Sequence, residues 1–75
     1  MFAYVLVSLL ECDEQEVLDK LLSYKEIKET HILFGEWDLI AKIEAKSPEA
    51  AGTFVMDKIR SLPDVKITST LIVAK

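Results

Sequence analysis

A short polar segment between two apolar stretches holds the residues best suited to bind a small molecule, Gly35 and Asp38. A glycine can adopt a positive φ and lets another group approach the backbone, and free backbone N–H groups at such a turn can bind a carboxylate. The Asp38 carboxylate is an acceptor suited to an ammonium group. Together the two features match the two charged groups of an α-amino acid. In the alternative interpretation Gly35 only forms the turn and Asp38 only caps it, and spacing alone does not decide between them.

A second polar cluster, Thr68-Ser69-Thr70, interrupts an otherwise apolar stretch near the C-terminus. Its hydroxyl groups would suit a ligand pocket at a subunit boundary. Threonine is also common in strands because of its β propensity alone, and without further information that simpler explanation is favoured.

Residues for catalysis or metal binding are few. His31 is the only histidine, Cys12 the only cysteine, and two glycines are too few for a phosphate-binding loop. A thiol–histidine pair would need an orienting group and an oxyanion hole that the sequence does not indicate. We therefore predict no catalytic residue, no metal and no cofactor, and expect Cys12 to be a small packing residue of a cytoplasmic protein.

The composition indicates one small globular domain spanning residues 1–75. Half of the residues are hydrophobic and the net charge is −4, with nine basic residues scattered among thirteen acidic ones. No basic stripe is present to bind a phosphate backbone, so direct nucleic-acid binding is not expected. The apolar run Phe2 to Leu10 is too short to span a bilayer and lacks a basic leader, so neither export nor membrane insertion is expected. A core of this size gives only marginal stability, and self-association would stabilise the fold.

The hydrophobic pattern predicts six elements in the order strand, helix, strand, strand, helix, strand. A helix capped by Asp13 follows the first strand, and a second helix begins at Ser47-Pro48, with serine as N-cap and proline in the first turn. The order is that of a split βαβ, ferredoxin-like α+β fold, with two helices on one face of a four-stranded antiparallel sheet. The predicted strands are Phe2 to Leu10, Ile27 to Phe34, Trp37 to Ala45 and Val65 to Ala74.

Both faces of the first predicted strand are apolar, with Phe2, Tyr4 and Leu6 on one side and Val5 and Val7 on the other. An antiparallel sheet with one solvated face alternates apolar and polar residues instead. The face without helices is therefore predicted to pack against the sheet of a second copy, which makes the protein at least a homodimer.

Two segments of the chain resemble the effector domain of Lrp/AsnC (feast/famine) transcriptional regulators, also called the RAM domain. The run FGEWDLIAKIE is similar to the G-x-x-D hairpin of that domain, VKITSTLIV is similar to its last strand, and the βαββαβ order agrees over the whole chain. The resemblance implies a ferredoxin-like fold that dimerises through its sheets. It also implies rings of dimers, often octamers, with amino-acid effectors bound between the dimers.

Carried over to this sequence, the resemblance implies that the Gly35 backbone binds the effector carboxylate and Asp38 holds its amino group. Phe34 and Trp37 would flank the pocket. The polar residues of the last strand would complete it, namely Thr68, Ser69 and Thr70.

Full-length members of the family carry an N-terminal helix-turn-helix, whereas this sequence begins with the first strand of the effector domain. We therefore expect a stand-alone effector-sensing and oligomerising domain that modulates regulation without binding DNA itself, with full-length regulators as possible partners. Two alternatives stay open: a small dimeric α+β barrel enzyme, for which His31 would have to serve nearly alone, and a structural oligomer without an effector. An ACT-type domain ranks lower because Glu11-Cys12-Asp13 lacks the glycine expected after its first strand.

Overall fold

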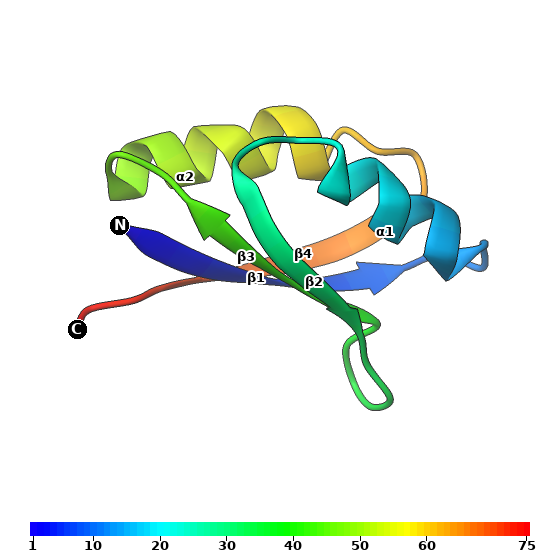
Figure 1. Cartoon of the computed structure of the whole chain (residues 1–75). Coiled ribbons are helices and arrows are strands. Elements are labelled where there is room, and N and C mark those ends of the chain that lie inside the picture. The colour runs from blue at the N-terminus through cyan, green and yellow to red at the C-terminus, as the bar shows by residue number, and fades with distance from the viewer.

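The computed structural model describes residues 1–75 and has the predicted order of elements (Figure 1). Four strands form one antiparallel sheet in the order β2-β3-β1-β4. Both helices lie on the same side of it, so the fold has one helical layer and one sheet layer. The elements are β1 (Phe2–Leu9), α1 (Glu14–Leu22), β2 (Ile27–Ile32), β3 (Leu39–Glu44), α2 (Pro48–Phe54), η1 (Val55–Ile59) and β4 (Val65–Ile72).

The central strand β1 carries the core. Its residues Ala3, Val5 and Val7 are completely buried beneath the helices. Residues paired directly across an antiparallel ladder share a face, so the partners on β3, from Leu39 to Ile43, continue this surface. The helices pack on this surface through Val17 and Leu21 of α1 and through buried residues of α2 and η1. Burying one large aliphatic side chain such as Leu21 contributes about 1.5–3 kcal/mol.

The helices begin where the sequence predicts. The Asp13 side chain accepts a hydrogen bond from the Gln15 backbone N–H at 3.0 Å, and the Ser47 hydroxyl accepts one from Ala50 N–H at 3.1 Å. Each bond satisfies an N–H group that has no partner within the helix. The second helix does not stay α-helical to its end, because it widens into the π-helical segment η1 after Phe54.

The prediction of a tight hairpin at Gly35-Glu36 is wrong. β2 ends at Ile32 and β3 starts at Leu39, so a six-residue loop, residues 33–38, joins them and Trp37 and Asp38 lie outside the strand. A hydrogen bond of 2.8 Å from Leu33 N–H to the Asp38 carbonyl oxygen closes this loop. The first and last strands are also shorter than predicted, since β1 ends at Leu9 and β4 at Ile72.

The sheet face without helices, called the open face below, has an apolar half and a charged half. The apolar half lies over β1, β4 and the nearest part of β3. The charged half lies over β2 and the outer part of β3, where Glu29 contacts His31 at 2.9 Å and Lys42 at 4.0 Å. The apolar half consists of Phe2, Tyr4, Leu6, Ile40, Ile67 and Leu71. The face without helices is therefore apolar over β1 and β4, as the sequence predicts for these strands, and charged over β2 and the outer part of β3. No helix of the fold is long and apolar enough to cross a membrane.

Glutamate substitutions on the two faces of β1 should have opposite effects. Val5→Glu places an unpaired charge in the fully buried core and should lower the free energy of unfolding by several kcal/mol. Leu6→Glu places it on the open face, so the domain should stay folded and lose self-association instead. Urea unfolding followed by circular dichroism, together with light scattering on a sizing column, distinguishes the two. An unfolded Leu6→Glu variant would contradict this assignment of faces.

Candidate functional site

The loop of residues 33–38 projects from the end of β2 and β3 to the side of the sheet opposite the helices (Figure 1). At its tip Phe34 is completely exposed, and Gly35 has a φ of 155°, which L-residues rarely adopt. The backbone N–H groups from Phe34 to Trp37 donate no hydrogen bond within the chain. The loop therefore offers free N–H donors around a glycine.

Asp38 joins this loop to the end of β1. Its carboxylate oxygen Oδ2 accepts a hydrogen bond from Leu9 N–H at 2.7 Å, and its own N–H donates to the Val7 carbonyl oxygen at 2.9 Å. The carboxylate is half-buried, and its Oδ1 atom accepts no hydrogen bond from the chain. Asp38 thus closes the end of the ladder with one oxygen, and the other oxygen has no hydrogen-bond partner within the chain.

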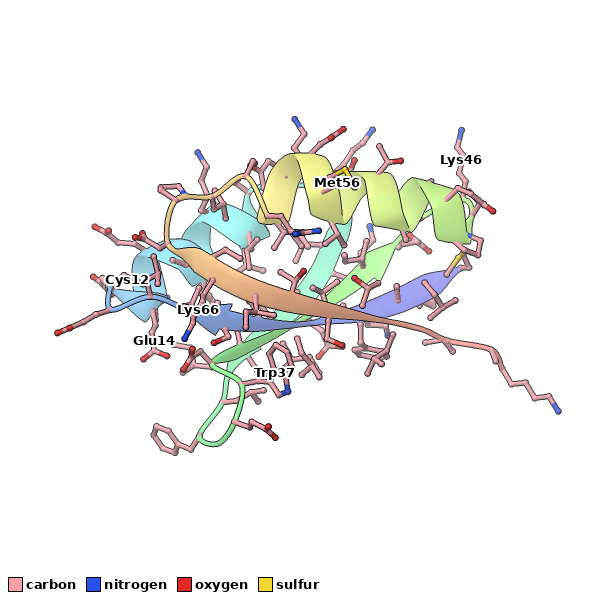
Figure 2. The ribbon with its side chains drawn as sticks, turned by 180° about the vertical axis from the view of Figure 1, so that it is seen from behind. Cys12, Glu14, Trp37, Lys46, Met56 and Lys66 are labelled. Carbon is pink, nitrogen blue, oxygen red and sulfur yellow. The ribbon has the colours of Figure 1, made fainter.

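A shallow pocket of about 250 Å³ opens beside Asp38, between the end of β1 and the start of α1. Besides Asp38, carboxyl groups from Glu11 and Glu14 line it, and no basic side chain does. Figure 2 shows Cys12 and Glu14 at this end of the fold, and Trp37 on the side of the sheet away from the helices. The remaining lining residues are Leu9, Leu10 and Cys12.

The negative charge around this pocket affects the pKa of the Cys12 thiol. Partial burial raises the pKa of Cys12 above its ordinary value, and the negative charges of Asp64, Glu14, Asp13 and Asp38 raise it further. The thiolate is therefore disfavoured, which is the opposite of an activated nucleophile.

The predicted site residues do not all come together. Asp38 lines the pocket, whereas Phe34, Gly35 and Trp37 belong to the projecting loop and do not line it. The last-strand cluster is divided by its register. Thr68 and Thr70 pair with Val7 and Val5 on the helix side of the sheet, while Ser69 pairs with Leu6 on the open face, and none of the three lines a pocket.

The sequence interpretation missed Glu11, Cys12 and Glu14 as neighbours of Asp38, which lies more than twenty residues further along the chain. The predicted order of strands in the sheet was enough to place these residues near Asp38. β1 and β3 pair antiparallel with Val7 opposite Leu39, so the start of β3 must lie beside the end of β1. Residues that follow β1 are therefore placed next to the residue that precedes β3.

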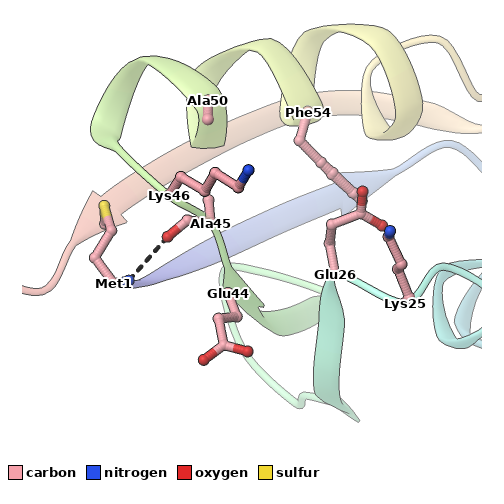
Figure 3. A pocket seen from close by; sticks show the side chains of 8 residues that line it. All are labelled: Met1, Lys25, Glu26, Glu44, Ala45, Lys46, Ala50 and Phe54. Atoms are coloured by element: carbon pink, nitrogen blue, oxygen red, sulfur yellow. Dashed lines mark hydrogen bonds between the residues drawn. The ribbon is translucent and has the colours of Figure 1, made fainter.

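A larger pocket, of about 560 Å³, lies at the opposite end of the sheet, below the start of α2 (Figure 3). Charged side chains of both signs line it, among them Lys25, Glu26, Glu44 and Lys46. The Met1 amino group donates a hydrogen bond to the Ala45 carbonyl oxygen there at 2.8 Å. None of the predicted site residues lies in this pocket, and no group of three or more acidic, histidine or cysteine side chains in the fold is arranged to hold a metal ion.

Comparison with known proteins gives consistent matches. A family model described as the Lrp/AsnC ligand-binding domain matches residues 3–75. The HTH-type transcriptional regulator FL11 of Pyrococcus abyssi is 36% identical over 75 residues, which are 100% of this chain and 49% of FL11. The chain thus spans about half the length of this curated relative.

Solved structures share the fold. The crystal structure of FFRP-DM1 superimposes with a TM-score of 0.90 and 38% identity, covering 96% of each chain. A transcriptional regulator from Neisseria meningitidis, solved as a complex with L-Met, superimposes with a TM-score of 0.88, covering 99% of this chain and 49% of that one. At 21% identity this second similarity concerns the fold alone.

Removing the Asp38 carboxylate should loosen the end of β1. In Asp38→Ala the half-buried Leu9 N–H loses its acceptor, and the free energy of unfolding should fall by about 1–3 kcal/mol. Asp38→Asn keeps an amide oxygen for that bond, so its loss should be at most about 1 kcal/mol. Chemical denaturation of both variants measures the difference. Equal losses would mean that the bond to Leu9 contributes nothing specific.

The raised pKa of Cys12 predicts a pH dependence. Because the folded-state pKa lies above the unfolded value, the folded state holds the thiol proton more tightly. The resulting stability is fully present below the unfolded pKa and is lost as the pH rises through the folded pKa. The wild type should therefore lose more stability than Cys12→Ser in the alkaline range, as measured by thermal melts from pH 7 to 10.5. Parallel curves for the two proteins would contradict the shift.

Proposed function

Since the chain belongs to the family of Lrp/AsnC ligand-binding domains, we propose that it senses an α-amino acid and assembles with further copies through the open face of its sheet. The family and the matched relatives are transcriptional regulators, not enzymes. In the proposed role, the domain binds an effector and thereby changes a regulatory assembly; it does not convert the effector chemically.

The observation that carries the amino-acid proposal is the free Oδ1 atom of Asp38 next to the glycine loop. A half-buried carboxylate that already receives one N–H group has one acceptor left for an ammonium group. The unbonded N–H groups from Phe34 to Trp37 supply donors for the effector carboxylate. The Neisseria regulator with the same fold was solved with an amino acid, L-Met, which supports this ligand class.

The open face supports the proposed self-association. Its exposed apolar side chains include Phe2, Ile67 and Leu71, which are 37%, 54% and 52% exposed. A 75-residue domain gains substantially from covering such a surface. The projecting loop lies on the same side of the sheet, so a covering copy would sit beside the effector-binding residues (Figure 1). We propose a sheet-to-sheet homodimer and, through contacts of the exposed Phe34, a ring of dimers.

The proposed partners are regulators of the same family. The relative FL11 is about twice as long as this chain and is named an HTH-type regulator, whereas the chain itself is acidic, with a net charge of −4. Such a charge disfavours direct contact with a phosphate backbone. In this proposal the domain modulates Lrp/AsnC-type regulation through assembly. An effector bound where copies meet favours whichever assembly completes its site.

A thermal-melt screen against the twenty amino acids tests the proposal. A ligand at a hundred times its dissociation constant stabilises the folded state by about 2.7 kcal/mol. One or a few amino acids should raise the melting temperature of the wild type. The rise should be lost in Asp38→Asn, which keeps the bond to Leu9 N–H and removes only the charge.

Light scattering on a sizing column, with and without each hit, shows whether the effector changes the assembly. An intact oligomer that no amino acid stabilises would contradict effector sensing and favour a purely structural oligomer. A monomer at micromolar concentration would contradict the proposed use of the open face.

A further inference from the structure

We draw no further inference here: the strongest candidate, the pocket below the start of α2, is lined by two lysines and two glutamates whose charges balance, and nothing in the structure shows which ligand would fill it.

Discussion

The burial of β1 is the constraint on which the rest of the structure depends. This strand lies between β3 and β4, and its residues Ala3, Val5 and Val7 are sealed beneath both helices. Its central position fixes the register of β3 and thereby places Asp38 at the point where β1 ends. The hydrogen bond from Leu9 N–H to Asp38 then attaches the loop to the sheet. The Asp38 carboxylate is thus held in position by the same ladder that organises the core.

The elements of the fold were predictable because each is specified by local chemistry. Asp13 and Ser47-Pro48 mark the helix starts, and the apolar runs mark the strands. The comparisons and the sheet order confirm the ferredoxin-like fold. The boundaries around Gly35 were not predictable in the same way. Phe34 and Trp37 are residue types typical of strands. A backbone hydrogen bond from Leu33 N–H to the Asp38 carbonyl oxygen nevertheless closes a loop there. The context of the fold thus outweighs β propensity at these positions.

The candidate site was predictable only in its local part. Gly35 and Asp38 are close in sequence, and their functions as a turn residue and an acceptor follow from their chemistry. The acidic wall formed by Glu11 and Glu14 depends on the pairing of β1 with β3, which brings together segments distant in sequence. The faces of Thr68, Ser69 and Thr70 depend on the register between β1 and β4, and a composition-based argument cannot supply that register.

The division of the open face into an apolar and a charged half gives this surface a direction. A two-fold contact places the same patch of both copies against itself. The charged half contains Glu29, His31 and Lys42. If the two sheets met centre to centre with their strands aligned, the charged half of one copy would face either the charged half or the apolar half of the other copy. Overlap of the apolar halves alone avoids burying these charges. In the proposed homodimer, the surface would therefore favour an offset stacking of the two sheets, with both β2 edges at the rim.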